Sequence, residues 1–536
     1  MFIFTFLFMS KDKYLLTFLA FVTILLLWKY FPISFDNNDD QAMFAISAGV
    51  FSKIQSPNLI LSHLIVGKSL SQLFLFNKNI NWYTLYLQII QLFSFIAIAF
   101  LFIKKNSLSL LSSIGLILFL LLGFFSLSIV KLQFTTIALF CCFTALFYMQ
   151  CDLKTSYKSI IILVFVAISI LIRKDSFYIF MLFCIPIFIS KIKDRNEIVR
   201  IVSISMIAVC VFFACMFFTN NNSVYKEQQT YTHVNAFDII AGKTIKINNT
   251  IIQKNNFSKN DIALIQSWFM ADDVYLKGNK LEQVAIQLQA NRNITEIQQE
   301  LKKFVQDERY LLLLYLISLL LVLLFNRKSI SIVCLNFLVF IFVLMYLTVT
   351  SRIPHRITFP ILTYLVLLNV WLFFENVERK KTKFGVMILL VSLSAYKFYC
   401  TSKIIYIHHE NHQIFDACKN EINAHPNNLF IALDDFPMQF MNAWQTPQPI
   451  FPIYNIIPAG WYACSPDYQF LLKLHHLKNL TSDIKNRNEI LFLTNDDALQ
   501  SAYINVMKER YHIVCHFEKA QDGFSFLHPK KLVIDN

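Results

Sequence analysis

The sequence predicts an α-helical polytopic membrane protein with about eleven transmembrane helices and a small α/β domain at its C-terminal end. Three observations lead to this fold class. Hydrophobic residues make up 56% of the 536 residues and charged residues only 15%. The apolar residues gather in runs near the roughly 20 residues that a helix needs to cross a bilayer. A soluble composition returns after residue 400. Lipid must therefore be the main solvent of most of the chain.

Eleven apolar runs are candidates for spanning helices. They lie near residues 14–33, 84–103, 108–127, 129–149, 158–173, 176–190, 199–218, 309–326, 329–350, 356–375 and 384–400. A further apolar run at 58–76 is interrupted by polar residues, and counting it as a span would invert every later loop. We therefore expect it to be a helix at the membrane interface.

The distribution of Lys and Arg predicts the orientation. Alternate loops are rich in these residues, among them Lys104, Lys105, Lys191, Lys193, Arg327, Lys328 and the stretch 379–383. Short cytoplasmic loops of membrane proteins are enriched in Lys and Arg. The net charge of +14 then reflects topology, and nucleic acid is not an expected partner.

This orientation places the N-terminus in the cytoplasm. The loops 34–83 and 219–308 and the residues 401–536 lie on the outer side. We expect two domains, a transmembrane core at 1–400 that includes both outer loops and an extracytoplasmic α/β domain at 401–536.

The outer regions have their own secondary-structure patterns. Short apolar runs at 429–433, 490–493 and 512–517 predict strands, and 498–509 predicts a helix between two of them. In the loop 219–308, the patterns at 261–269 and 281–304 predict amphipathic helices lying on the membrane.

Several kinds of site are disfavoured. Nine glycines and no glycine-rich phosphate loop argue against soluble-nucleotide chemistry. The eleven cysteines are scattered without a CxxC pair, so we expect no disulfide or metal framework. The histidines at 408–412 lack a recognised metal spacing, and we expect a solvated segment there.

A set of outer-face charges forms the candidate site. The catalytic candidates are Asp39 and Asp40, and the phosphate-binding candidates are Arg173, Lys174, Arg352, Arg356 and Lys131. Basic residues on the outer side oppose the general charge trend, which favours a role in binding an anionic group. The planar fork of Arg fits phosphate oxygens, and a carboxylate can take the proton of an attacking hydroxyl. Two carboxylates can also bind a divalent metal, but two ligands do not define a metal site. We therefore assign no cofactor, and the binding of a divalent metal stays an open alternative.

Each of the three outer regions contains short motifs. They are Asn38-Asp39-Asp40, Ser47-Ala48-Gly49, Leu64-Ile65-Val66-Gly67-Lys68, Trp82-Tyr83, Phe257-Ser258-Lys259-Asn260-Asp261, Trp268-Phe269, Asp272, Gly460-Trp461 and Ser465-Pro466. Together with the basic outer turns, they resemble the GT-C superfamily of membrane glycosyltransferases, and more closely bacterial GT-C-like polytopic proteins of unassigned substrate.

The resemblance implies a GT-C-like core in the bacterial cytoplasmic membrane. It also implies an inverting glycosyltransferase whose donor is a sugar linked to polyprenyl phosphate. The acceptor is then an extracytoplasmic surface glycan, lipid or protein, and membrane lipids are the other partners. The resemblance specifies neither the sugar nor the oligomeric state.

Three other functions stay open at the level of sequence. A transporter or flippase of a lipid-linked glycan would use the same arginines, but transporters place ionisable residues near the midplane and the apolar runs of this chain are nearly free of charge. A surface polysaccharide polymerase or ligase would share the arginine chemistry. A non-catalytic assembly protein would hold its carboxylates away from any cavity.

Overall fold

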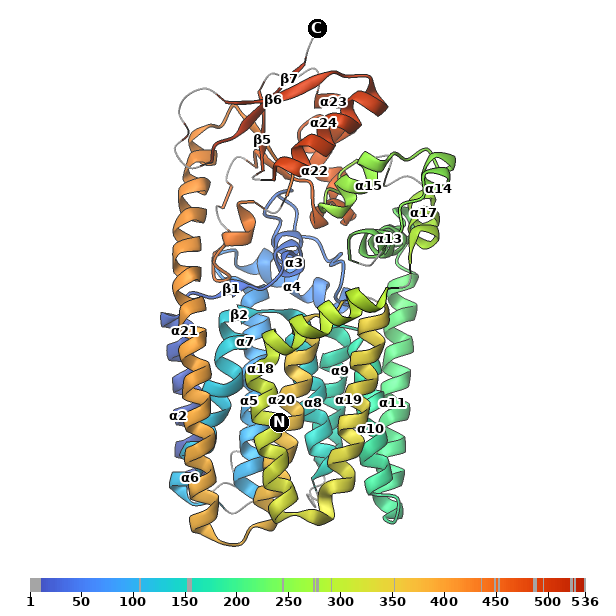
Figure 1. The fold of residues 1–536 in the computed structure, drawn as a ribbon. Helices are drawn as coiled ribbons and strands as arrows, with labels where there is room; N and C mark the ends of the chain where they lie inside the picture. The colour runs from blue at the N-terminus through green and yellow to red at the C-terminus, as the bar shows by residue number, and fades with distance from the viewer. Residues whose placement is uncertain are drawn as a thin grey trace.

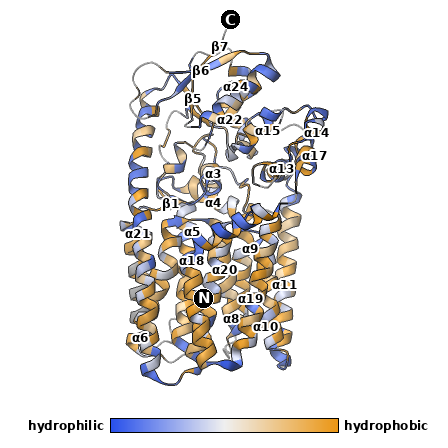
Figure 2. Ribbon diagram, viewed as in Figure 1, coloured by the Kyte–Doolittle hydropathy of each residue, from blue (hydrophilic) through white to orange (hydrophobic). Residues whose placement is uncertain are grey.

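The chain folds as a bundle of long helices with a layer of short helices and a sheet at one end (Figure 1). The computed structural model describes residues 11–105, 108–151, 157–242, 245–272, 275, 279–290, 292–350, 352–434, 436–447, 450–451, 454–484, 489–494, 496–520, 524 and 527–534. Hydrophobic residues are concentrated in the bundle, and hydrophilic ones in the layer and at the far end of the bundle (Figure 2). We call the layer of short helices and sheet the outer layer.

The bundle contains the predicted spanning runs. Its helices are α2 (Lys11–Tyr30), α5 (Trp82–Lys105), α6 (Leu110–Leu120), α7 (Ser126–Val130), α8 (Phe134–Gln150), α9 (Lys158–Ile172), α10 (Ser176–Ser190), α11 (Arg195–Asn220), α18 (Ile294–Phe325), α19 (Ile330–Thr350), α20 (His355–Asn376) and α21 (Lys380–Ala424). A π-helical turn at Leu121–Phe125 joins α6 to α7.

Seven helices of the described chain are long and apolar enough to cross a membrane. These are α5, the continuous α6–α7 segment, α11, α18, α19, α20 and α21, whereas α4 (Leu64–Phe76), α8, α9 and α10 are shorter apolar helices. The mostly helical membrane fold is therefore confirmed, and the count of eleven spans stays a prediction.

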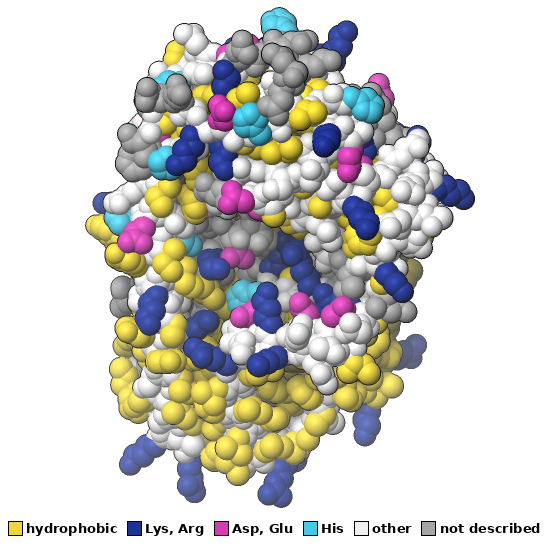
Figure 3. Space-filling view, turned by 45° about the horizontal axis from the view of Figure 1, so that its top comes forward, with side chains coloured by type: hydrophobic (Ala, Val, Ile, Leu, Met, Phe, Trp, Pro, Cys, Tyr) yellow, Lys and Arg dark blue, Asp and Glu magenta, His cyan; other side chains and the backbone are white. Residues whose placement is uncertain are grey.

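The outward faces of the bundle are apolar. Phe213 and Phe217 on α11 are 64% and 66% exposed, Leu316 on α18 is 60% exposed, and Phe342 on α19 is 59% exposed. Figure 3 shows hydrophobic side chains covering this part of the surface. Contiguous exposed apolar surface of this kind is costly in water and suits contact with lipid.

The three regions predicted on the outer side lie together in the outer layer (Figure 1). The first holds α3 (Asn38–Ala48) and α4, and the second holds α12 (Ser223–Glu227), α13 (Thr230–Gly242), α14 (Asn249–Lys254), α15 (Lys259–Gln266) and α17 (Lys280–Leu288). The opposite end of the bundle carries basic helix ends, including Lys105 of α5 and Lys158 of α9. This separation agrees with the charge pattern, and which end faces the cytoplasm stays a prediction.

A five-stranded sheet forms the C-terminal part of the outer layer. Its strands are β3 (Leu429–Ala432), β4 (Ile456–Pro458), β5 (Ile490–Leu493), β6 (Cys515–Lys519) and β7 (Lys530–Ile534), in the order β4-β3-β5-β7-β6. β4, β3 and β5 are parallel, while β7 is antiparallel to β5 and β6. The short helices α22 (Tyr468–Leu474), α23 (Leu480–Asp483) and α24 (Asp497–Tyr511) accompany the sheet.

Two boundaries differ from the expected ones. The strand predicted at 512–517 begins only at Cys515, because α24 continues to Tyr511 and His512 then caps it in the left-handed conformation, with φ of 55°. Helix α21 runs without a break to Ala424, so the domain boundary expected after residue 400 falls inside a helix. The division into two domains stays a prediction.

Two histidines of α21 are buried, so the prediction of a solvated segment at 408–412 was wrong for one face of the helix, while His409 and Glu410 on another face are exposed. His408 and His412 are each 9% exposed, and His412 Nε2 lies 2.9 Å from Ser34 Oγ. One turn of helix separates the two rings, and that face of α21 packs against the segment after α2. Among the described residues no group of three or more potential ligands could hold a metal.

Helix α15 packs against α24 of the outer layer, which corrects the expectation that it lies on the membrane. Asp261 at its start accepts a hydrogen bond from Arg510 at 2.5 Å and one from Tyr275 at 3.0 Å. Burial raises the pKa of Asp261, and Arg510 opposes that rise. A buried ion pair therefore ties the loop 219–308 to the C-terminal sheet region.

We predict that Gly67→Ala destabilises the protein. A Cβ at Gly67 would lie 1.9 Å from the carbonyl oxygen of Pro57, so α4 would have to move away from the segment that precedes it. Overpacking of this kind costs about 1–3 kcal/mol. The melting temperature in detergent, followed by tryptophan fluorescence, should fall.

Gly385→Ala is the matched control. A Cβ at Gly385, in α21, would have nothing within 4 Å, and Ala is the better helix former. Its melting temperature should stay the same or rise. Equal melting temperatures for Gly67→Ala and the wild type would contradict the close approach.

Candidate active site

A short parallel strand pair places the acidic motif. Ser34 and Phe35 of β1 pair with Lys131 and Leu132 of β2 (Lys131–Leu132), which brings the start of α3 beside the start of α8. Helix α3 begins directly afterwards, with Asp39 and Asp40 in its first turn. Carboxylates are favourable there because the amino end of a helix carries partial positive charge.

Asp40 is fully buried and lies away from solvent. Its Oδ1 accepts a hydrogen bond from the Tyr83 hydroxyl at 2.7 Å and one from the Phe134 backbone N–H at 3.2 Å. Its Oδ2 has no hydrogen-bond partner among the described residues. Burial raises the pKa of Asp40 well above its ordinary value, and the nearby Asp39 adds to the rise. Asp40 therefore joins α3, α5 and α8, and its burial favours the neutral carboxyl.

We predict that Asp40→Asn folds normally and removes a pH-dependent loss of stability. The folded protein binds the Asp40 proton more tightly than the unfolded chain does. Raising the pH above the ordinary aspartate pKa of about 3.9 therefore lowers wild-type stability until the folded-state pKa is passed. Asn keeps the acceptor oxygen and cannot ionise. Relative to the wild type, its melting temperature should increase as the pH rises above that ordinary value. A difference that does not change with pH would contradict a raised pKa for the buried Asp40 carboxyl.

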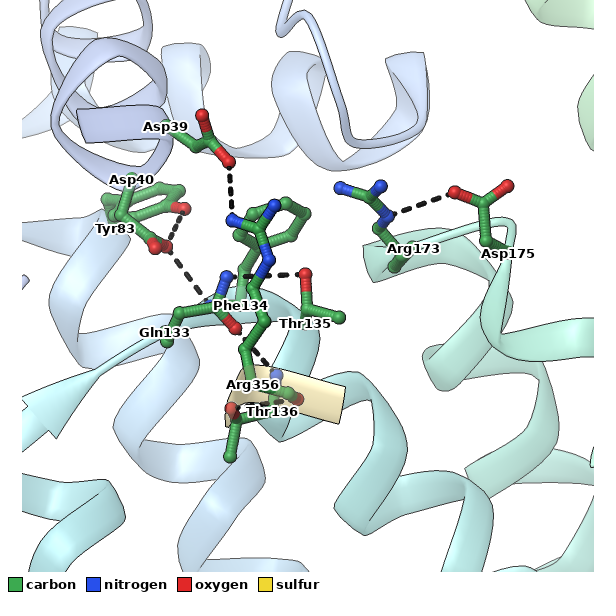
Figure 4. A network of polar contacts seen from close by, with 10 residues as sticks. All are labelled: Asp39, Asp40, Tyr83, Gln133, Phe134, Thr135, Thr136, Arg173, Asp175 and Arg356. Atoms are coloured by element: carbon green, nitrogen blue, oxygen red, sulfur yellow. Dashed lines mark hydrogen bonds and ion pairs between the residues drawn. The ribbon is translucent and has the colours of Figure 1, made fainter. Parts of the chain in front are cut away.

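Asp39 forms an ion pair with Arg356. Arg356 Nη1 donates to Asp39 Oδ2 at 3.0 Å, and the two side chains are 19% and 7% exposed. Figure 4 shows the other carboxylate oxygen of Asp39 pointing away from this pair. That oxygen, Oδ1, accepts no hydrogen bond from any described residue, and Asp39 lines a cavity. One oxygen is thus held by a cation and the other is available to a ligand.

The turn that carries Arg356 is held by acidic residues of α18. Glu308, itself 2% exposed, lies 2.8 Å from His355 Nδ1 and accepts a hydrogen bond from the Thr358 hydroxyl at 2.6 Å. Glu300 accepts a hydrogen bond from the backbone N–H of Ile353 at 3.3 Å. The amino end of α20 is therefore fixed at both sides of the arginine.

Arg173 follows the end of α9. Its Nε donates to Asp175 at 3.1 Å, and its guanidinium lies 5.3 Å from the centroid of the Phe134 ring. The loop before α4 is anchored beside Arg173, because the Ser62 hydroxyl donates to the carbonyl of Ile172 at 2.9 Å. In Figure 4 the terminal nitrogens of Arg173 point away from Asp175, in the direction of Arg356 and Asp39.

Two adjoining cavities bring most of the predicted residues together. The larger has a volume of about 400 Å³ and is lined by Asp39, Arg173, Lys174 and Arg356 among others. The smaller has a volume of about 180 Å³ and is lined by Arg173, Arg352 and Arg356, with apolar residues of α8, α10, α19 and α20. Figure 3 shows the surface hollowed between the bundle and the outer layer, with Lys and Arg side chains in the hollow.

Two of the predicted residues lie elsewhere. Lys131 forms an ion pair with Asp36 at 2.9 Å and is absent from the described lining of both cavities. Asp40 is absent from that lining too, although it is adjacent to Asp39 in sequence. The strand pair and the helix turn explain both results, because β1 and β2 carry Lys131 toward Asp36 and the first turn of α3 points Asp40 inward.

Three residues outside the predicted site also line the larger cavity, and of these only Trp461 belongs to a motif noted in the sequence. Asn235 and Asp238 come from α13, and Trp461 comes from the turn after β4. Asp238 lines the smaller cavity as well. The sequence around α13 holds no motif, and only the helical spacing of Asn235 and Asp238 indicates that they share one face.

Comparisons with known proteins give a distant structural likeness. No family model and no curated protein matches the sequence. Two solved structures that resemble the chain are crystal structures of ArnT from Cupriavidus metallidurans, one in the apo state and one bound to undecaprenyl phosphate. Both are 10% identical in sequence, with TM-scores of 0.37 and 0.36. The matches cover 96% and 97% of this chain and 97% of each ArnT chain.

At TM-scores this low the likeness carries no functional argument. The function has to be inferred from the geometry of the two cavities.

Proposed function

We propose that the protein is an integral-membrane glycosyltransferase that moves a sugar from a polyprenyl-phosphate-linked donor to an acceptor on the outer face of the membrane. This proposal rests on one observation. The carboxylate of Asp39 lines a cavity together with cationic side chains that come from separate turns of the chain. Arg173 and Arg356 line both cavities, and Arg352 lines the one that is set among apolar residues of the bundle. A phosphate bound by these arginines would keep its lipid chain on the bundle side.

The residues fit a single displacement at the anomeric carbon. The acceptor hydroxyl oxygen forms a bond to that carbon as its proton passes to Asp39 Oδ1. The bond from the anomeric carbon to the phosphate oxygen breaks, and the lipid phosphate leaves with the electron pair. Arg173, Arg356 and Arg352 stabilise the charge that grows on the leaving phosphate. The configuration at the anomeric carbon is inverted.

The position of the cations supports transfer over transport. Arg173 lies at the C-terminal end of α9, Arg352 in the turn before α20 and Arg356 in the first turn of α20, all at the junction of bundle and outer layer. A transport pathway would need ionisable groups farther along the bundle, near its midplane. We infer that the junction faces the outer side of the bacterial cytoplasmic membrane, because the opposite end carries the basic loops.

Purified protein in detergent tests the proposal. It is incubated with a polyprenyl-phosphate sugar whose sugar is radiolabelled and with an extract of envelope glycans and lipids. Label that moves to an acceptor, with release of free polyprenyl phosphate, supports a transferase. Binding of the lipid without any chemical change, across a panel of donor sugars, would favour a flippase.

A further inference from the structure

The roof of the larger cavity is aromatic on one side and polar on the other. Trp461, the first residue of the turn Trp461–Cys464, lines the cavity and packs against Trp268, with ring centroids 5.5 Å apart. Asn235 and Asp238 line the same cavity from α13, which contacts that turn. The two polar side chains are exposed and lie one helical turn apart.

The two tryptophans are held in place by the backbone of both outer regions. The backbone N–H of Met270 donates to the carbonyl of Ala459 at 2.8 Å, which joins the residues after α15 to those after β4. Trp268 has a φ of 65°, a left-handed conformation that favours glycine after a helix. A bulky side chain at such a position is strained and is kept only where the surroundings fix it.

This combination suits a sugar ring. One face of a pyranose presents C–H groups, which pack on the electron-rich face of an indole. Its hydroxyl groups need donors and acceptors at the rim, and Asn and Asp side chains supply both kinds. Asp238 makes no ion pair or side-chain hydrogen bond with any described residue, so its carboxylate is available to a ligand.

We infer that Trp461, Asn235 and Asp238 form the subsite for the sugar carried by the lipid, beside the arginines that hold its phosphate. This inference rests on the proposed function and names the part of the substrate that each side of the cavity binds. Trp461 and Asp238 then determine specificity, and the arginines bind the phosphate whichever sugar is attached.

Binding measurements separate the two roles. Microscale thermophoresis on the full chain in detergent would compare a C55 polyprenyl phosphate with the same lipid carrying a pentose, a neutral hexose or a hexosamine. The wild type should bind at least one of the sugar-bearing lipids about tenfold more tightly than the bare lipid. Asp238→Asn and Trp461→Leu should each remove most of this tenfold difference in affinity without lowering the affinity for the bare lipid. Trp461→Phe, which keeps an aromatic face, should retain most of it.

Asp307→Asn on the exposed surface of α18 and Trp444→Leu in the outer layer are the matched controls, since neither residue is in the described lining of the cavities. Should Trp461→Leu fail to fold, Asp238→Asn still tests the subsite, because Asp238 is exposed. An unchanged ratio of affinities in Asp238→Asn and Trp461→Phe, or no margin in the wild type, overturns the subsite and leaves the phosphate site standing. No binding of any of these lipids by the wild type overturns the proposed function as well.

Discussion

Asp39→Asn should abolish sugar transfer and leave lipid binding intact. The carboxylate accepts the proton of the acceptor hydroxyl through Oδ1, and an amide cannot take that proton. General-base catalysis by a positioned side chain contributes about 10²- to 10⁴-fold, and we expect kcat to fall by that factor. The affinity for the bare lipid phosphate should hold or increase, because Arg356 loses a competing anion. Single-turnover transfer and equilibrium lipid binding measure the two effects separately.

Asp36→Asn is the control for this prediction. It makes the same chemical change in the same segment, but Asp36 pairs with Lys131 and is not in the described lining of either cavity. It should transfer sugar at close to the wild-type rate. Turnover near the wild-type level in Asp39→Asn would remove Asp39 from the mechanism, and equal losses in both variants would indicate a structural effect of the segment.

The contrast between Asp39 and Asp40 shows what the sequence could not predict. The motif and its place after the first span were visible in the sequence, but neighbouring residues of a helix point about 100° apart. Which of the two meets the cavity depends on the face of α3 that packs against Tyr83 and Phe134. No local pattern encodes that packing, because every residue from Asp39 to Ala48 is buried.

The basic turns were more predictable. A short turn between two apolar runs must lie at a membrane surface, and charge bias then gives its side. This reasoning placed Arg173, Lys174, Arg352 and Arg356 together. It could not show that Lys131 pairs with Asp36, because the pairing of β1 with β2 joins segments about 100 residues apart.

The length of α21 was missed although its signal was present. Hydropathy ends near residue 400, but the buried residues His408, His412, Phe415, Cys418 and Ile422 recur at intervals of three or four. That spacing is typical of an amphipathic helix. The helix therefore continues beyond the apolar run and carries the outer sheet above the cavities.

Arg356 is the cation whose loss should have the largest effect. It lines both cavities and pairs with Asp39, so it contacts the proposed base and faces the proposed phosphate. Removing a preorganised charge of this kind costs about 10²- to 10³-fold in turnover, which we expect for Arg356→Gln together with weaker lipid-phosphate binding. Arg356→Lys keeps the charge but loses the planar fork, and it should restore only part of both. Transfer rates and lipid affinities of the two variants, each normalised to folded protein, test this order.

Stability has to be separated from function at this residue. Breaking a buried ion pair from one side costs about 3–5 kcal/mol, so Arg356→Gln should also lower the melting temperature. Combining it with Asp39→Asn removes the unpaired carboxylate and should recover much of the stability without recovering transfer. Lys131→Gln is the control, since it removes a neighbouring outer cation that pairs with Asp36 instead of lining a cavity. If Lys131→Gln weakened lipid-phosphate binding as much as Arg356→Gln, the phosphate would be bound by the general charge of the outer face and not by the fork of Arg356.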